Sequence, residues 1–467
     1  TTATAAMADD DTAALYALTP LDGRYAGRVS KIRDYFSEAA LIKARVRVEV
    51  EYLASLSQVI PALGDVFEGD NLKRWRAVAA TFGPADAQRV KSIEATTNHD
   101  VKAVEYYLKE QWDALKLPPI GREYIHFGLT SQDVNHTAQP LLLAECARDV
   151  LIPRYTDLIA ALKERAWKWR DVAMLARTHG QSASPTRVGK EFAVFASRLQ
   201  ACVDQLQACS HSAKFGGATG GFNAHSVAFP SVDWPSFGDA FVRDVSQGLL
   251  TRQKHTTQIE HYDGLAAFCH ALCRANTVML DLCRDCWQYV SLAYFTQKLK
   301  AGEVGSSAMP HKVNPIDFEN SEGNIGVANA ALLHLAAKLP VSRLQRDLSD
   351  STVLRTLGVP LGHSFLAIGA CLRGLGKLEL NTTRIADDLE SNWAVVAEGI
   401  QTVLRREAYP NPYEALKQLT RTGKPIDASA IAAFVSSLNV SEAVKAELRA
   451  ITPHSYVGVF DASEFAP

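Results

Sequence analysis

The sequence lacks any apolar run long enough to cross a membrane, because no stretch of about 18 consecutive apolar residues occurs in its 467 residues. It also lacks a charge excess of either sign: 49 lysines and arginines stand against 51 aspartates and glutamates, a net charge of −2. No block of basic residues is present. These absences argue against a membrane protein and against a nucleic acid as partner, so any site for an anion must be a local cluster of cations.

Metal-binding and nucleotide-binding patterns are missing as well. Among the eight cysteines, Cys283 and Cys286 form a C-x-x-C, but there is no second pair and no histidine pair at zinc spacing. We therefore predict reduced core thiols and no metal. The glycine-rich stretch GGATGGFNAH, residues 216–225, is not followed by Gly-Lys-Ser/Thr and does not follow a strand pattern, so no phosphate-binding loop or dinucleotide site is predicted.

The N-terminal stretch TTATAAMADDDTAA has no apolar segment of the kind that a secretory signal carries. Together with the cysteine usage, this leads us to expect a cytoplasmic protein.

Helical periodicity dominates the chain, and strand alternation is nearly absent. Apolar residues recur at threes and fours from Ser30 to Ser57, from Ser131 to about residue 171 and from residue 263 to about 298. Two further patterns run from Pro315 to Leu339 and from about Pro360 to residue 377. Helices this long suit a bundle, so the predicted fold is all-α.

Chain breakers divide this pattern into three expected domains. Pro118 and Pro119 interrupt the chain, and turn residues recur after residue 377. We predict an N-terminal helical domain at 1–119, a central long-helix bundle at 120–377 and a helical C-terminal domain at 378–467. Inside the bundle, Pro153 predicts a kink because its ring removes one helical hydrogen bond.

The segment GEVGSSAMPHKVNP, residues 302–315, is the most informative stretch of the sequence. Gly305 precedes two serines, so the backbone there is free to adopt left-handed geometries and to move. Asn314 and Pro315 favour a helix start, since Asn is a strong N-cap and Pro suits the first helical position. A hydroxyl, the Lys312 cation and a helix N-terminus suit removal of a proton beside an anion. An ordinary polar loop before a helix is the alternative.

Two other predicted helix starts carry polar clusters. Asn98, His99 and Asp100 precede one helix, and together they could read the edge of a heterocycle, although ordinary capping needs only one of them. Thr130 and Ser131 precede another, where hydroxyls and free N–H groups can converge on a carboxylate.

Two loops complete the set of candidate segments. His179 lies between helices in the loop 176–187, and histidine changes charge near pH 7 without strong perturbation, although an exposed loop histidine is common. Arg346, Ser351 and Arg355 are close in sequence, and arginine forks bind phosphate bidentately. Because Asp347 and Asp350 are interleaved, scattered surface ion pairs are the alternative.

The segment 302–315 resembles the G-S-S-x-x-M-P-x-K-x-N-P motif of the fumarase/aspartase superfamily, whose members eliminate fumarate. Its extension MPHKVNPIDFENSEGN is most similar to the bacterial type of adenylosuccinate lyases, and DGRY, TTNHDVKAVEY and THGQ resemble other segments of that family. The resemblance runs from Leu21 to about Val457. It departs from the family near Gly221, where an Asn is more usual, so that segment receives no role.

The resemblance implies the aspartase/fumarase-like architecture and a homotetramer whose sites combine residues of three chains. It implies elimination of fumarate from adenylosuccinate, giving AMP, and from succinylaminoimidazole carboxamide ribotide (SAICAR), giving AICAR, with no cofactor. Ser306 is then the general base and His179 the general acid, and a histidine as base is the alternative division of roles. The residues implied to bind substrate are Arg24, Tyr25, Asn98, His99, Asp100, His126, Thr130, Ser131, Thr178, Gln258, Ser307, Lys312, Val313, Asn314, Asn320, Arg346, Ser351 and Arg355.

Two rival functions remain at this stage. One is another fumarate-releasing lyase of the superfamily, most plausibly argininosuccinate lyase, although enzymes of that type tend to carry other residues where His311 stands. The other is a non-catalytic structural protein on the same scaffold, as some lens crystallins are. The presence together of Ser306, His179, Lys312 and Asn314 argues against a structural role, which does not need them.

Overall fold

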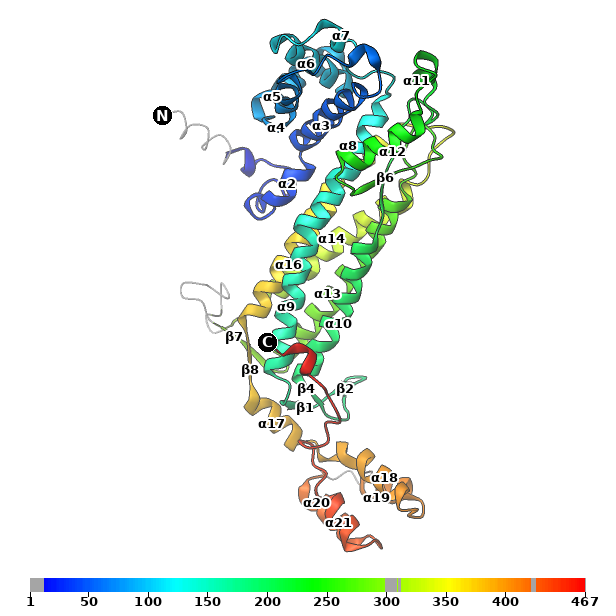
Figure 1. Cartoon of the computed structure of the whole chain (residues 1–467). Coiled ribbons are helices and arrows are strands. Elements are labelled where there is room, and N and C mark those ends of the chain that lie inside the picture. The colour runs from blue at the N-terminus through cyan, green and yellow to red at the C-terminus, as the bar shows by residue number, and fades with distance from the viewer. Residues whose placement is uncertain (1–11, 299–308, 310–311, 421–425, 467) are drawn as a thin grey trace. The chain divides into compact units, whose positions relative to one another are not determined.

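The structure is a computed structural model that describes residues 12–298, 309, 312–420 and 426–466. Helices dominate it (Figure 1), and its strands are only two or three residues long. The predicted all-α fold is therefore confirmed. In chain order the α-helices are α2 (Ser30–Phe36), α3 (Glu38–Leu56), α4 (Asn71–Ala80), α5 (Pro84–Thr97), α6 (Asp100–Ala114), α7 (Pro119–Arg122), α8 (Ser131–Cys146), α9 (Ile152–Lys168), α10 (Val188–Ala208), α11 (Asn223–Ala228), α12 (Trp234–Val245), α13 (Asp263–Ser291), α14 (Ile316–Lys338), α15 (Ser349–Leu354), α16 (Gly358–Lys377), α17 (Thr382–Glu390), α18 (Ala397–Arg406), α19 (Pro412–Thr420), α20 (Ala428–Ser437) and α21 (Glu442–Arg449).

Short helical turns and strand pairs connect these helices. The 3-10 turns are η1 (Ala26–Arg28), η2 (Pro61–Leu63), η4 (Trp393–Val396) and η5 (Ser463–Phe465), and η3 (Ala147–Leu151) is a π-helix. The strands are β1 (Ala173–Met174), β2 (Arg177–Thr178), β3 (Gln181–Ser182), β4 (Thr186–Arg187), β5 (His211–Ala213), β6 (Leu250–Arg252), β7 (Phe295–Gln297) and β8 (Leu378–Leu380). They form the antiparallel pairs β1–β4, β2–β3 and β7–β8 and the parallel pair β5–β6.

The chain divides into two compact units. Unit 1 contains Thr1–Tyr155, Cys202–Thr277 and Gly323–Ala367, and unit 2 contains Thr156–Ala201, Val278–Glu322 and Ile368–Pro467. The three-domain division expected from the sequence stays a prediction.

The core of unit 1 is built around α3, which is buried on most of its surface. Tyr52 of α3 lies 5.6 Å from Phe241 of α12, centroid to centroid, and Trp75 of α4 lies 5.0 Å from Trp112 of α6. The prediction of a single helix from Ser30 to Ser57 is wrong, because the chain forms two helices, α2 and α3, that are separated by Ser37. Ser37 is extended, with ψ 159°, and its hydroxyl caps α3 by accepting the Ala40 N–H at 3.2 Å.

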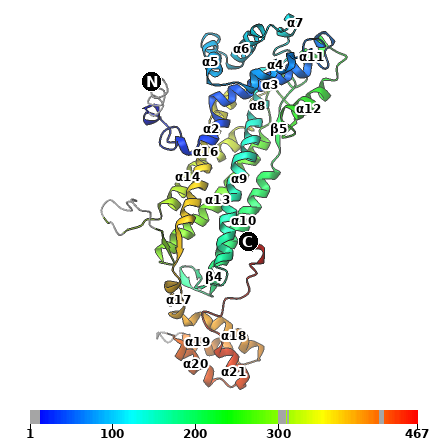
Figure 2. The same ribbon diagram turned by 60° about the vertical axis from the view of Figure 1, so that its left-hand side comes forward.

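Buried polar contacts join the long helices, which run alongside one another in Figure 2. In unit 1, Asn276 of α13 accepts from Tyr155 of α9 at 2.6 Å and donates to Ser364 of α16 at 2.9 Å. In unit 2, Tyr289 of α13 donates to Glu191 of α10 at 2.7 Å. Within each unit the long helices therefore pack as a bundle, as their lengths predict.

These helices depart from regularity at one expected place and at one unexpected place. Near Pro153 the regular helix gives way to the π-helix η3, since proline cannot supply the N–H that would close the preceding turn. The helix expected to reach residue 298 ends at Ser291 instead. Ala293 adopts φ 60°, and the chain then enters β7, whose pairing with β8 replaces helical hydrogen bonds.

Among the described residues, the helical stretch Ser349–Lys377 is long and apolar enough to span a membrane by length and composition alone. However, 67% of its most apolar window is buried inside the protein, as in the core helix of a bundle. All eight cysteines are free thiols, and seven of them are buried.

The C-terminal helices in unit 2 have a small core of their own, made by Ile400 and Leu404 of α18, Val435 of α20 and Leu448 of α21.

Candidate active site

The N-terminus of α8 is anchored by a buried ion pair that the sequence analysis did not predict. Thr130 is the N-cap, and its backbone N–H donates to the carboxylate of Asp133 at 2.8 Å. Asp133 also accepts from Lys214 Nζ at 2.8 Å, and both side chains are fully buried. Burial lowers the pKa of Lys214, and the Asp133 carboxylate opposes this shift. The ion pair fixes the backbone that carries Thr130 and Ser131.

The same carboxylate holds the glycine-rich segment in place. Asp133 accepts from the backbone N–H groups of Gly216 at 2.9 Å and Gly217 at 3.0 Å. Gly217 adopts φ 81°, a conformation that L side chains rarely take. The segment is thus a tight connection held by one carboxylate. The sequence signal for Asp133 was the capping box formed by Thr130 and the residue three positions later.

Four predicted residues meet at the start of α6, and a fifth, Asn98, precedes them in the chain. His99 is the N-cap and accepts the Lys102 N–H at 3.2 Å, and its Nε2 lies 3.5 Å from Ser131 Oγ. Asp100 accepts from Arg355 Nη2 at 3.3 Å. Asn98, the C-cap of α5, has left-handed φ of 51°.

Asp100 is also bound by a buried arginine, Arg45, whose Nη2 donates to it at 2.7 Å. Burial raises the pKa of Asp100, but Arg45, the Val101 N–H and Arg355 together outweigh burial, so the pKa lies below its ordinary value. Asp100 is therefore ionised and holds Arg355, a role that the sequence analysis did not foresee.

His126, a predicted site residue with φ 63°, pairs with a buried carboxylate. Its Nδ1 lies 2.5 Å from Glu49 Oε1, and Glu49 is 1% exposed. Burial lowers the pKa of His126, but the carboxylates of Glu49, Glu105 and Asp133 together outweigh burial, so the pKa lies above the ordinary 6.5.

This pair predicts a pH-dependent contribution to stability. Because the folded-state pKa of His126 is raised, its stabilisation is fully present below pH 6.5 and is lost as the pH rises through the folded-state pKa. Glu49→Gln should therefore lower the melting temperature more at pH 5.5 than at pH 9. As a control, Glu145→Gln breaks the 2.8 Å pair with Arg47, in which no histidine takes part, so its effect should be the same at both values. A Glu49→Gln effect equal at both pH values would contradict the pairing.

The predicted phosphate-binding arginine lies in a second cluster of unit 1. Arg346 Nη2 donates to Ser351 Oγ at 2.8 Å, and Nη1 donates to Gln258 Oε1 at 3.4 Å. The structure thus brings together three predicted residues. Arg343, by contrast, forms an exposed pair with Asp347 at 3.1 Å, as the surface-pair alternative describes.

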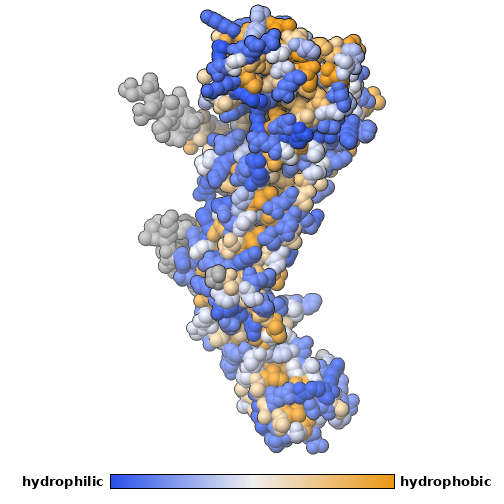
Figure 3. Space-filling view, viewed as in Figure 1, coloured by the Kyte–Doolittle hydropathy of each residue, from blue (hydrophilic) through white to orange (hydrophobic). Residues whose placement is uncertain are grey.

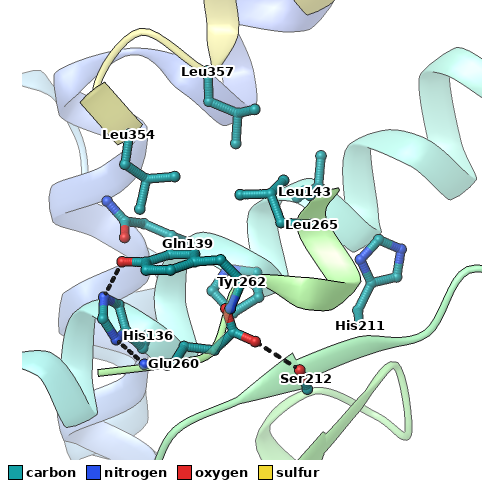
Figure 4. A pocket seen from close by; sticks show the side chains of 11 residues that line it. His136, Gln139, Leu143, His211, Ser212, Glu260, Tyr262, Leu265, Leu354 and Leu357 are labelled. Carbon is teal, nitrogen blue, oxygen red and sulfur yellow. Dashed lines mark hydrogen bonds between the residues drawn. The ribbon is translucent and has the colours of Figure 1, made fainter. Parts of the chain in front are cut away.

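A pocket beside this cluster is lined by residues that the sequence analysis missed (Figure 4). His136, Glu260 and Tyr262 converge there, and burial raises the pKa of Glu260 to about 7. Glu260 and Tyr262 stand in the string TTQIEHYD around Gln258, whereas His136 stands in SQDVNHT, which begins at Ser131.

The loop histidine lies in unit 2. β2 and β3 form a hairpin whose turn is His179 and Gly180, with φ of 53° and 73°. His179 and Thr178 are exposed. Next to the turn, Arg177 forms a 2.5 Å ion pair with Asp388. The hairpin presents the imidazole to solvent.

Ser306 and Ser307 lie outside the described residues. Beyond them, Lys312 is exposed, and the Val313 carbonyl accepts from Gln297 Nε2 at 3.1 Å. The predicted helix start is nearly confirmed: α14 begins at Ile316, one residue later than expected, and Asn320 lies on its first turns, partly exposed. The exposed cation and the helix N-terminus therefore adjoin in sequence, as predicted.

Arg24 and Tyr25 lie in a series of turns before η1. Arg24 is exposed, and Tyr25 N–H donates to the Pro20 carbonyl at 2.8 Å. Within the described ranges, no group of three or more His, Cys, Asp or Glu side chains could hold a metal ion.

Comparison with known proteins identifies the family. A family model described as lyase matches residues 23–329, and one described as adenylosuccinate lyase C-terminal matches residues 342–457. The chain is 53% identical to adenylosuccinate lyase of Dictyostelium discoideum over 95% of this chain and 97% of the relative. It is 46% identical to that of Escherichia coli K12, with the same coverage.

Solved structures support the fold. The 3-carboxy-cis,cis-muconate lactonizing enzyme from Pseudomonas putida has a TM-score of 0.73 at 20% identity, covering 93% of this chain and 94% of that one. The fumarate lyase from Mesorhizobium sp. BNC1 has a TM-score of 0.70 at 18% identity, covering 93% and 96%. From the family models and the identity to curated relatives, the chain belongs to the adenylosuccinate lyase family.

Proposed function

We propose that this protein cleaves adenylosuccinate to AMP and fumarate by β-elimination, and SAICAR to AICAR and fumarate. The observation that carries this proposal is the identity of 53% to a curated adenylosuccinate lyase across 95% of the chain. The clusters around Arg346 and Arg355 support it, because they supply local cations on a chain whose net charge is only −2. The cytoplasmic location is part of the same proposal.

The elimination removes a proton from the carbon next to one carboxylate and breaks the C–N bond at the neighbouring carbon. The electron pair of the C–H bond becomes the C=C bond of fumarate, and the leaving nitrogen receives a proton. The carbanion is accessible only when the adjoining carboxylate accepts its charge. Lys312, Asn314 and the N-terminus of α14 are assigned to that dianion.

Ser306 is assigned as the base and His179 as the acid. A serine hydroxyl is a weak base in water, so Ser306 needs nearby cations and exclusion of water to favour its ionised form. His179 is exposed on a hairpin turn and can carry a proton to the leaving nitrogen.

Sites assembled from several chains of a homotetramer are also proposed. Large apolar side chains are exposed on the long helices, namely Val194 of α10, Trp287 of α13, and Val327 and Leu333 of α14. Figure 3 shows apolar residues among the polar ones on the visible face. Association would cover such residues. Light scattering should then give four times the mass of one chain, and a monomeric mass would contradict the assembly.

The test of the reaction is the change in ultraviolet absorbance when adenylosuccinate is added, run beside argininosuccinate. Turnover of adenylosuccinate alone supports the proposal. Turnover of argininosuccinate alone would replace it with the related lyase, and turnover of neither would favour a structural protein.

Arg355→Ala should weaken substrate binding first. Arg355 lies between Asp100 and Glu38, at 3.3 and 3.5 Å, and its assigned partner is the substrate phosphate. Loss of a contact made equally in the ground state and the transition state raises KM and leaves kcat nearly unchanged. Steady-state kinetics with adenylosuccinate measures both constants, and a fall in kcat at unchanged KM would contradict the assignment.

A further inference from the structure

Three buried side chains, those of His136, Tyr262 and Asp350, form a hydrogen-bonded relay next to the cluster of Gln258, Arg346 and Ser351. His136, Tyr262 and Asp350 are 2%, 3% and 2% exposed. Tyr262 Oη lies 2.8 Å from His136 Nε2 and 2.9 Å from Asp350 Oδ2. Figure 4 shows the phenol of Tyr262 reaching the imidazole, with the backbone of Glu260 at the other ring nitrogen.

The Glu260 backbone indicates which tautomer His136 adopts, and with it the direction of the hydrogen bonds from His136 to Tyr262 and from Tyr262 to Asp350. The Glu260 N–H donates to His136 Nδ1 at 2.9 Å, so Nδ1 carries no proton. Burial, together with the charges of Lys214 and Arg346, lowers the pKa of His136 to about 3, which keeps the ring neutral. Its proton is therefore on Nε2 and is donated to Tyr262 Oη. The phenol O–H is left to donate to Asp350.

Asp350, which accepts the Tyr262 hydrogen bond, also contacts the predicted phosphate-binding residues Ser351 and Arg346. Its Oδ1 accepts the Ser351 N–H at 2.7 Å and lies 3.5 Å from Arg346 Nε. Because Arg346 Nη2 donates to Ser351 Oγ, the carboxylate orients the guanidinium and the hydroxyl that it contacts. Asp350 is the ion-pair partner for Arg346 among the described residues.

The other end of the relay holds the segment that carries Gln258. His136 accepts from Glu260, two residues after Gln258, and Tyr262 belongs to the same stretch. Glu260 accepts from Ser212 Oγ at 2.9 Å, which ties the stretch to β5. One phenol thus joins two segments far apart in sequence, and each of them carries a residue assigned to the substrate.

We propose that Tyr262, together with His136 and Asp350, is a positioning residue for substrate binding: it holds Arg346 and Ser351 in register with Gln258. This inference rests on the proposed function, since it needs these three residues to contact substrate. In this inference Tyr262 acts through Asp350 and His136 and does not itself contact the substrate.

Tyr262→Phe is the sharpest test. It leaves the ring in place and removes the hydrogen bonds to His136 and Asp350. The Asp350 carboxylate is then no longer held in a fixed orientation toward Arg346. KM for adenylosuccinate should rise roughly tenfold, the factor produced by loss of about one buried hydrogen bond to a charged group, with kcat changed less than about twofold. Tyr155→Phe is the matched control: it removes an equally buried hydroxyl, 2.6 Å from Asn276, and should leave KM unchanged.

A double-variant cycle separates positioning from general loss of structure. In an Arg346→Gln background, Tyr262→Phe should raise KM little further, because the residue that it positions is gone. A full additional tenfold rise, or a Tyr262→Phe variant with the KM of Tyr155→Phe, would overturn the inference. If Tyr262→Phe fails to fold, Asp350→Asn replaces it with the same expected rise in KM.

The same measurements show which claim has failed. If Arg346→Gln raises KM while Tyr262→Phe does not, the relay is wrong and the proposed function stands. If the unmodified protein does not turn over adenylosuccinate, the proposed function itself is wrong, and the inference falls with it.

Discussion

Ser306→Ala should lower kcat for adenylosuccinate by roughly 10²- to 10⁴-fold, the contribution of a positioned acid–base group, while the variant still binds substrate. The methyl group cannot take the proton from the carbon beside the carboxylate, but the residues assigned to binding are unchanged. Rapid-mixing kinetics measures turnover, and calorimetry measures substrate affinity. The expected result is a near-normal Kd with almost no product.

Ser307→Ala is the matched control, because it removes the same hydroxyl one residue away. Ser307 is assigned to substrate binding, so this variant should change KM more than kcat. Near-normal turnover by Ser306→Ala, together with a collapse of kcat in His179→Gln, would favour histidine as the base and would falsify the division of roles proposed here.

Lys214→Met should destabilise the protein more than any surface ion-pair variant. The substitution leaves the fully buried Asp133 carboxylate without its cation, and breaking a buried pair costs about 3–5 kcal/mol. The backbone N–H groups of Gly216 and Gly217 remain as donors but carry no net charge. The expected result is a lower melting temperature and faster hydrogen exchange at Gly216 and Gly217.

Arg76→Met provides the comparison for that experiment. Arg76 and Glu51 pair at the similar distance of 2.7 Å, but their side chains are 49% and 28% exposed. Exposed pairs contribute only about 0–1 kcal/mol. Equal melting temperatures for Lys214→Met and Arg76→Met would show that the buried pair does not anchor the N-terminus of α8.

Local signals in the sequence predicted the fold well. Helix periodicity located α13, α14 and α16, and the proline near residue 153 marked a real irregularity, because each of these features depends on residues within one or two helical turns. Of the two errors, one has a local cause and the other does not. Ser37 ends one helix and caps the next, and the pairing of β7 with β8 depends on a segment that follows more than 80 residues later.

The structure brings some of the candidate site residues together, and their roles stay predictions. Arg346, Ser351 and Gln258 meet, as do His99, Ser131, Asp100 and Arg355. What the sequence could not predict are the buried partners that orient them. Asp133 and Lys214 are 81 positions apart, and Tyr262 and Asp350 are 88 apart, so no local pattern links the members of either pair.

These partners look ordinary in the sequence. An aspartate three residues into a helix indicates only a capping box, and a tyrosine after Glu-His indicates nothing specific. Burial gives them their role, since a buried carboxylate or phenol must find a partner.

The most direct test of the account is product analysis by proton NMR when adenylosuccinate is incubated with the full chain. Elimination predicts fumarate and AMP in equal amounts, with no aspartate. Release of aspartate would indicate hydrolysis, and the absence of any product would remove the substrate assignment; either result would contradict the proposed β-elimination.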